Sequence, residues 1–196
     1  MPSGKVTVKA TFAKVSEQPE PGSMAFTDVA SSAYYYDAVK WAVEQGITSG
    51  ITATTFGPDA SCTRAQMVSF LWRANGSPKA AGANPFTDVS ADAYYYDAVL
   101  WAVEKGITSG TSATTFSPNA TVTRGQTVSF LHRANGSPAV SGSSPFTDVA
   151  ADAYYAAAVQ WAVAENITAG TSATTFSPDA ACTRGQIVSF LYRDMA

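Results

Sequence analysis

The chain repeats itself three times at a spacing of 60 residues, and few folds are compatible with such a repeat. The tetrapeptide Phe-Thr-Asp-Val begins at Phe26, Phe86 and Phe146. Units of this length bury their apolar faces against one another, so we expect the copies to form one folded body. The predicted boundaries are 24–78 for repeat 1, 79–138 for repeat 2 and 139–196 for repeat 3.

The first half of each repeat predicts a short amphipathic helix. In repeat 1, Tyr35, Val39 and Val43 recur at intervals of four residues, which places them on one helical face. Gly46 follows at the position where a helix commonly ends with a left-handed residue. We therefore predict a helix over residues 34–45, followed by an irregular or short extended connection over residues 47–60.

The second half of each repeat predicts a helix with a marked start. Thr63 is followed three residues later by Gln66, which is the pattern of a capping box. The predicted helix runs over residues 64–74, and its apolar residues cover more than half of its circumference, which indicates a central, buried helix. The fold class is thus all-α, with three tandem helix-loop-helix repeats.

Residues 1–23 do not fit the repeat. Residues 5–15 alternate between apolar and polar side chains, as in a half-buried strand. Because a lone strand is not a stable domain, we interpret 1–23 as the remnant strand and linker of a preceding domain. On this interpretation the chain is the C-terminal part of a longer protein.

Charge and hydropathy exclude several classes of partner. The formal net charge is −3, so the chain has no broad basic field for nucleic acid or an anionic membrane surface. No apolar run approaches the roughly 20 residues that cross a bilayer, which argues against membrane insertion. Only 14% of the 196 residues are charged and 12% are aromatic, a composition that suggests an extracellular surface module.

These motifs together resemble the S-layer homology family. The order is Phe-x-Asp-Val, an aromatic-rich helix, a Gly-Ile turn, Phe56-x-Pro58 and a Thr-Arg-Ala-Gln helix start, in three copies from Met24 to Ala196. The family's helix start usually reads Thr-Arg-Ala-Glu, and it often has Asp-Gly where this chain has Thr54-Thr55. The resemblance implies a pseudo-threefold bundle whose grooves between repeats bind pyruvylated secondary cell wall polymer.

Arginine occupies only two positions of the repeat. One set opens the second helix, where backbone N–H groups and the helix dipole favour an anion. Arginine also grips a carboxylate with two hydrogen bonds, so we predict that this set binds the ligand. The alternative is that these arginines pair with Asp28, Asp88 and Asp148 and lock the repeats together. The second set lies near helix C-termini, which favours a structural role. The two sets are Arg64, Arg124 and Arg184, and Arg73, Arg133 and Arg193.

Neighbouring residues at the helix start complete the polar part of the candidate site. The threonine and glutamine of each capping box stand beside the arginine, and glutamine adds no negative charge there. Gly125 and Gly185 follow two of the arginines and suggest close approach by a ligand, or equally by another backbone at the threefold axis. The capping residues in the candidate site are Thr63, Thr123, Thr183, Gln66, Gln126 and Gln186.

Aromatic residues of the first helix provide flat surfaces for sugar rings. The tryptophans have helical spacing that favours core packing, whereas one tyrosine of each repeat lies off the apolar stripe and is the better sugar contact. We include both sets in the candidate site. They are Trp41, Trp101 and Trp161, and Tyr34, Tyr94 and Tyr154.

Catalytic chemistry finds little support in the sequence. His132 stands where the other repeats have Trp72 and Tyr192, which suggests a residue at the rim of the bundle. Clusters with metal-ligand spacing, a phosphate-binding loop and a nucleophile elbow are all missing from the sequence, so we expect no enzyme activity, metal or cofactor.

Two cysteines share one position of the repeat with a valine. Cys62 and Cys182 align with Val122, which favours buried free thiols. A disulfide remains an alternative, because an exported protein could form one if the threefold packing brings the two positions together.

The sequence therefore predicts a non-catalytic anchor that binds an anionic cell wall polysaccharide outside a Gram-positive-type cell. We expect the chain alone to be monomeric. One alternative is a protein-protein assembly module of a surface layer, which would expose large apolar patches. A less favoured alternative is a cell wall glycan hydrolase, which would need paired carboxylates.

Overall fold

The computed structural model describes residues 24–196, so the predicted strand and linker at 1–23 lie outside the described residues. Within that range the secondary structure consists of helices joined by turns and isolated bridges. The helices are α1 (Tyr36–Glu44), α2 (Arg64–Ala74), α3 (Tyr96–Glu104), α4 (Arg124–Ala134), α5 (Ala156–Ala164) and α6 (Arg184–Met195). The prediction of an all-α fold built from three helical repeats is confirmed.

The first helix of each repeat is shorter than predicted. Helix α1 starts at Tyr36 rather than at residue 34, because the preceding residues form turns and its N-cap has no side-chain hydrogen bond. The expected left-handed residue after the helix is confirmed, since Gly46 has a φ of 68°. In repeat 3 the same place is taken by Asn166 with a φ of 58°, and asparagine is the other residue that tolerates this conformation.

The second helix of each repeat begins at its capping box, as predicted. Thr63 Oγ1 accepts a hydrogen bond from Gln66 N at 3.2 Å, and Gln66 Oε1 accepts one from Thr63 N at 3.0 Å. The same reciprocal pair starts α4 and α6. Two backbone N–H groups that would otherwise lack a partner are satisfied at each start, which fixes where the arginine at the first helical position stands.

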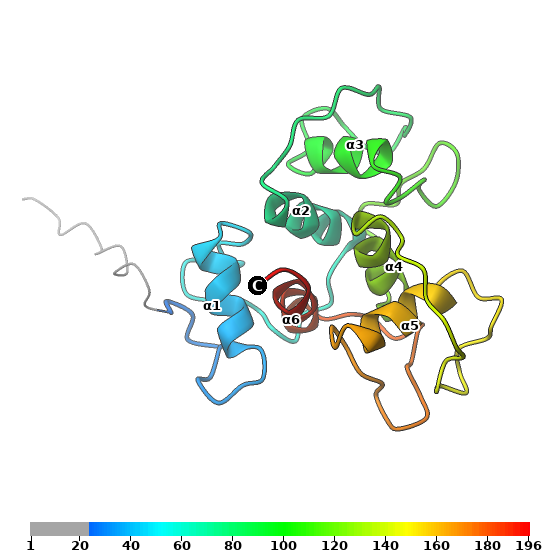
Figure 1. Ribbon diagram of the computed structural model, residues 1–196. Helices are drawn as coiled ribbons and strands as arrows, with labels where there is room; N and C mark the ends of the chain where they lie inside the picture. The colour runs from blue at the N-terminus through cyan, green and yellow to red at the C-terminus, as the bar shows by residue number, and fades with distance from the viewer. Residues whose placement is uncertain (1–23) are drawn as a thin grey trace, which may run out of the picture.

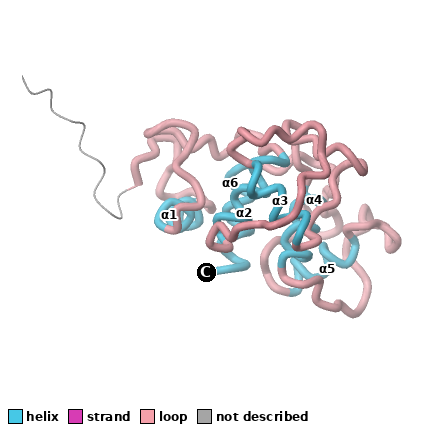
Figure 2. The backbone as a smooth tube through the Cα atoms, turned by 90° about the horizontal axis from the view of Figure 1, so that it is seen from above, coloured by secondary structure: helices cyan, strands magenta, loops and turns pink. Residues whose placement is uncertain are grey.

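The helices form a pseudo-threefold bundle. Helices α2, α4 and α6 lie at the centre, and α1, α3 and α5 lie around them (Figure 1). The outer helices pack on the second helix of a neighbouring repeat, in the pairs α3 with α2, α5 with α4, and α1 with α6. The last pair joins repeat 1 to repeat 3, so the arrangement is closed. Seen at right angles, loops make up much of the chain between the helices (Figure 2).

Backbone hydrogen bonds close the centre of the bundle. Cys62 N donates to Cys182 O at 3.0 Å, Cys182 N to Val122 O at 3.0 Å, and Val122 N to Cys62 O at 2.9 Å. We call these three residues the central ring. All three are fully buried, and both cysteines are free thiols in the structure. The ring therefore ties all three repeats together immediately before their second helices.

A second contact explains the small residues after the helix-start arginines. Gly125 N donates to Pro178 O and Gly185 N donates to Pro58 O, both at 2.8 Å. A Cβ atom at Gly185 would lie 3.1 Å from that carbonyl and 3.0 Å from the Tyr35 ring. The close approach is therefore made by the backbone and tyrosine of another repeat.

His132 is buried, so the expectation of a rim residue is wrong. Only 8% of its surface is exposed, and its Nε2 lies 2.9 Å from the carbonyl oxygen of Pro138. Trp72, at the same position of repeat 1, donates its Nε1 proton to Pro78 O at 2.8 Å. A ring nitrogen at this position thus satisfies the carbonyl of the turn that follows the helix.

Among residues 24–196, none of the helices has both the length and the apolar character needed to cross a membrane.

Candidate functional site

The arginines that open the second helices extend into the neighbouring repeat. Arg64 Nε donates to Phe116 O at 2.9 Å, Arg124 Nε to Phe176 O at 3.0 Å, and Arg184 Nε to Phe56 O at 2.9 Å. Each arginine is only 4–5% exposed. Each side chain therefore bridges two repeats with its Nε and leaves the outer edge of its guanidinium for other partners.

Aromatic rings surround each of these guanidinium groups. The Arg64 guanidinium lies 4.8 Å from the centre of the Phe116 ring and 5.5 Å from that of Phe130. Burial lowers the pKa of the Arg64 guanidinium below its ordinary value, although arginine remains charged in proteins at neutral pH. The Nη2 atom is buried and has no hydrogen-bond partner among the described residues. A buried cation with an unsatisfied donor strongly favours an anionic partner.

The aspartates of the Phe-Thr-Asp-Val motif do not neutralise these arginines by direct contact. Asp28 Oδ1 accepts from Phe56 N at 2.9 Å and Oδ2 accepts from Gly57 N at 2.7 Å. The same residue, Phe56, gives its carbonyl to Arg184, so the carboxylate and the guanidinium hold opposite sides of one turn. Within residues 24–196, the ion pair that forms is the surface pair Lys40–Glu44. The alternative of a direct arginine–aspartate ion pair is therefore not realised, because each side chain instead bonds the backbone of the same turn.

The backbone of the turn nevertheless stabilises the charged form of two of these aspartates, Asp28 and Asp148. Burial alone would raise the pKa of Asp28, but the backbone N–H groups of Phe56 and Gly57, with the nearby Arg184, lower it below its ordinary value. The pKa of Asp148 is lowered for the same reasons, by Phe176, Ser177 and Arg124. The carboxylates are thus held in their charged form at neutral pH.

A groove of about 330 Å³ opens beside Arg64 and is built by all three repeats. Repeat 1 provides the arginine, repeat 2 provides a polar loop and one face of α4, and repeat 3 provides a tyrosine. The lining residues are Arg64, Thr108, Ser109, Gly110, Thr111, Gln126, Ser129, Phe130, Arg133 and Tyr154. The groove combines two cations, several hydroxyl groups and two aromatic rings.

The tyrosine at this groove stands at its outer edge. Tyr154 is 62% exposed and its ring meets that of Tyr155 edge-on, with the centres 4.9 Å apart. Tyr34 lies near Arg124 and Tyr94 near Arg184, since burial lowers the pKa of each arginine and the tyrosine partly opposes that shift. The structure therefore brings the predicted tyrosines and arginines together, each pair from different repeats.

Comparison with known proteins identifies this arrangement. The S-layer homology domain matches residues 25–68, 85–128 and 145–188. The chain belongs to the S-layer homology family. The resemblance noted from the motifs is thereby confirmed, and family membership places the chain at the extracellular cell surface.

Three curated proteins illustrate the relationship. The surface-layer 125 kDa protein of Lysinibacillus sphaericus is 34% identical over 78% of this chain and 13% of its own length. A cell surface protein of Thermoanaerobacter kivui is 32% identical over 67% of the chain and 18% of its own length. An endoglucanase of Bacillus sp. (strain KSM-635) is 31% identical over 61% of the chain and 12% of its own length. The chain thus spans less than a fifth of each relative, and the S-layer homology domain itself is a non-catalytic anchoring module.

The capping residues of the S-layer homology repeats take part in the helix starts. The hydroxyl of Thr123 and the side-chain oxygen of Gln126 are used by the capping box, at 3.3 Å in both directions. Gln126 also lines the groove. The predicted threonines thus position the arginine, while the glutamine both caps the helix and faces the groove.

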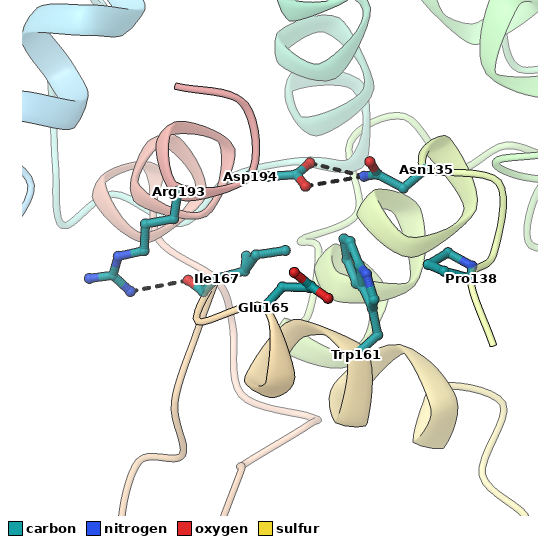
Figure 3. A pocket seen from close by; sticks show the side chains of 7 residues that line it. All are labelled: Asn135, Pro138, Trp161, Glu165, Ile167, Arg193 and Asp194. Atoms are coloured by element: carbon teal, nitrogen blue, oxygen red, sulfur yellow. Dashed lines mark hydrogen bonds between the residues drawn. The ribbon is translucent and has the colours of Figure 1, made fainter. Parts of the chain in front are cut away.

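The tryptophans lie in a different set of pockets. Trp41, Trp101 and Trp161 each line a hollow between an outer helix and the end of the central helix on which it packs, with volumes of about 360, 380 and 310 Å³. Trp101 and Trp161 are 4% and 6% exposed. In the pocket of Trp161, Asn135 donates to the carboxylate of Asp194 (Figure 3). The structure does not bring the tryptophans to the arginine groove.

The second arginine set has a structural bond and a position at the groove. Arg193 Nη1 donates to Ile167 O at 3.1 Å (Figure 3), and Arg133 Nη1 donates to Ile107 O at 3.1 Å. Arg133 also lines the groove of Arg64. We favoured a structural role for this set from the sequence, and we predicted neither the Thr108–Thr111 loop nor Ser129 as part of the site. Their recurrence at the repeat spacing was the signal that could have included them.

Proposed function

We propose that this chain anchors its protein to the cell wall by binding an anionic polysaccharide in the grooves between repeats. The observation that carries the proposal is the buried guanidinium at the groove of Arg64, whose Nη2 has no hydrogen-bond partner among residues 24–196. A carboxylate is the group that fits it best, because arginine binds planar anions through adjacent N–H groups.

The rest of the groove suits a sugar that carries such a carboxylate. Hydroxyl groups of the Thr108–Thr111 loop and of Ser129 can exchange hydrogen bonds with sugar hydroxyls. Tyr154 offers a flat apolar face at the entrance. A pyruvate ketal attached to a sugar ring presents one carboxylate on a compact apolar group, so a pyruvylated wall polymer matches both parts of the groove.

Several weak grooves on one chain would act together on a polymer. A repeating polysaccharide can occupy more than one groove, and the second contact then forms at high effective concentration. This mode of binding suits an anchor, because the polymer stays attached when one groove releases it.

The proposal is tested by binding to purified cell walls. The triple substitution Arg64→Lys, Arg124→Lys and Arg184→Lys keeps every charge and removes the planar fork, so we expect a loss of at least tenfold in affinity for walls. The matched control replaces Lys40, Lys79 and Lys105 by arginine, which alters three cations outside the arginine grooves. Walls stripped of their secondary polymer should bind neither the triple lysine variant nor the control variant.

The same experiment separates the anchor from a surface assembly module. If the triple variant keeps wild-type affinity for walls while its melting temperature is unchanged, the arginine grooves are not the binding sites. If the wild-type chain binds stripped walls equally well, or forms large assemblies by light scattering without any polymer, the assembly function is supported instead.

A further inference from the structure

The loop that faces each helix-start arginine differs in one peptide between the repeats. In repeats 1 and 2, Gly50 and Gly110 both have a φ of 86°. Their N–H groups donate to Thr48 Oγ1 at 3.2 Å and to Thr108 Oγ1 at 3.1 Å. In repeat 3, Gly170 lies outside the left-handed region. The peptide before this glycine therefore has another orientation in repeat 3.

The changed peptide presents its carbonyl to an arginine. Ala169 O accepts a hydrogen bond from Arg124 Nη2 at 3.0 Å and another from Thr168 Oγ1 at 3.1 Å. The sequence also differs at this point, since Ala169 stands where the other repeats have Ser49 and Ser109. The guanidinium of Arg124 is thus satisfied within the protein by two carbonyl groups, one on Nε and one on Nη2.

The other two arginines are not satisfied in this way. The Nη2 atoms of Arg64 and Arg184 are buried and have no hydrogen-bond partner among the described residues. Both side chains are 4% exposed, so the free donor lies in an environment with little access to water. A ligand carboxylate gains a charge-assisted bond at these two atoms, whereas at Arg124 it must first displace a carbonyl and leave that carbonyl unpaired.

We propose that the three helix-start arginines are not equivalent: Arg64 and Arg184 bind the carboxylate of the wall polymer, and the corresponding site at Arg124 is closed by the Ala169 carbonyl. This inference rests on the proposed function, because it divides the same ligand between the grooves. On this inference Arg124 is a structural residue, and Ala169 is the residue that closes the site at Arg124.

The inference is tested on the whole chain by following each arginine separately. The Nε–H signals of the three arginines are suitable NMR probes, because each is buried and bonded to a carbonyl. Single Arg→Lys variants assign them. The probe ligand is a methyl hexopyranoside with a pyruvate ketal bridging O4 and O6, and the same glycoside without the ketal is the control. We expect saturable shifts at Arg64 and Arg184, and binding at Arg124 at least tenfold weaker.

The single variants provide a second measurement on intact wall polymer. All three Arg→Lys substitutions remove the Nε bond to the next repeat, and Arg124→Lys also removes the Nη2 bond to Ala169 O, so Arg124→Lys is a control whose structural cost is at least as large. We expect Arg64→Lys and Arg184→Lys each to weaken polymer binding by about tenfold or more, and Arg124→Lys to leave it within twofold of wild type.

The possible results distinguish the two proposals. Equal shifts at all three arginines, or equal losses in the three variants, would overturn the inequivalence and leave the binding function in place. Shifts at none of them would overturn the proposed function and the inequivalence with it. Binding of the unpyruvylated glycoside at the same two arginines would show that the carboxylate is not what they select, and would also overturn the inference.

Discussion

At the scale of single residues, each helix-start arginine ties two repeats together, and we propose that Arg64 and Arg184 also bind the ligand. Its Nε donates a hydrogen bond to the carbonyl of a phenylalanine in the next repeat. The rest of the guanidinium lies at the groove in the case of Arg64 and bonds the Ala169 carbonyl in the case of Arg124. Deleting the side chain therefore removes a buried charge-assisted bond worth about 1.5–3 kcal/mol of stability, and at Arg64 and Arg184 it also removes the proposed ligand contact. Lysine substitutions separate the effect on stability from the effect on binding better than alanine substitutions, because lysine keeps the positive charge.

The two cysteines should be unreactive thiols in the native protein. Burial raises the pKa of Cys62 to about 12 and that of Cys182 to about 11, and only the thiolate reacts with an alkylating agent. We expect iodoacetamide at pH 8 to label neither cysteine in the folded chain and both in denaturant, as measured by mass spectrometry. A denatured, unreduced sample that takes up no label would show that the two cysteines are bonded.

Asp28 and Asp148, which anchor the turns of repeats 1 and 3, should make the stability of the folded chain depend on pH. The pKa of Asp148 is lower in the folded chain than its ordinary value, so its stabilising effect is present above the unfolded pKa and is lost as the pH falls through the folded one. Asp148→Asn should therefore lower the melting temperature at pH 7, with a smaller difference from wild type below about pH 4. Asp152→Asn, at an exposed position, is the control. A difference that stays constant down to pH 2 would contradict this account.

At the scale of elements, the start of each second helix is fixed by contacts with another repeat. Ala65 occupies the position of Gly125 and Gly185, and Ala65 N donates to Pro118 O at 3.0 Å, slightly longer than the 2.8 Å bonds of the two glycines. Repeat 1 thus shows that a Cβ atom fits after a small adjustment. Larger side chains would meet the tyrosine ring and the carbonyl of the neighbouring repeat.

This comparison predicts how substitutions at Gly185 behave. Alanine gains up to about 1 kcal/mol of helix propensity and tightens the contact with Pro58 O and Tyr35, so we expect Gly185→Ala to stay within about 1 kcal/mol of wild type. Gly185→Val adds atoms where the neighbours cannot move, and it should destabilise the chain by more than 1 kcal/mol. Denaturant unfolding measures both, with Ala65→Gly as the reverse control. A valine variant as stable as wild type would show that the contact between Gly185 and the neighbouring repeat is loosely packed.

The second helices could be predicted from sequence because their starts are local. The Thr-x-x-Gln pattern fixed residue 64 as the first helical residue without knowledge of the tertiary structure. The first helix was predicted two residues too early, because the turns before it carry aromatic residues that continue the helical spacing. His132 was misplaced because the partner of its ring, Pro138 O, belongs to the turn that follows.

The groove itself could be predicted only in part. Recurrence identified its arginines and tyrosines, but a pairing such as Arg64 with Tyr154 crosses repeats and depends on the closed packing. The orientation of the peptide at Ala169 could not be predicted from the replacement of serine by alanine there, because the glycine that follows accepts both orientations. The separation of the tryptophans from the groove likewise follows from packing between repeats.

At the scale of the whole molecule, the repeats depend on one another for their helix packing. The main contacts of α3 are with α2 of repeat 1, and those of α4 are with α5 of repeat 3. Both helices of repeat 2 therefore pack mainly against helices of the other two repeats. The central ring adds to this dependence, since Val122 donates to Cys62 and accepts from Cys182. The groove of Arg64 also draws on all three repeats, so its shape depends on the complete set.

We therefore expect residues 79–138 to be unfolded when expressed alone. A 60-residue unit buries only about 60% of its unfolded surface even when it is compact, and here both helices would expose the apolar faces that neighbouring repeats cover. Circular dichroism should show little helix at 20 °C and no cooperative melting transition, whereas residues 24–196 should melt in a single transition. Because adding repeats 1 and 3 as separate chains restores the missing partners only at high concentration, any recovery of helix should depend on concentration. Cooperative melting of the isolated repeat near the temperature of the full chain would contradict the shared core.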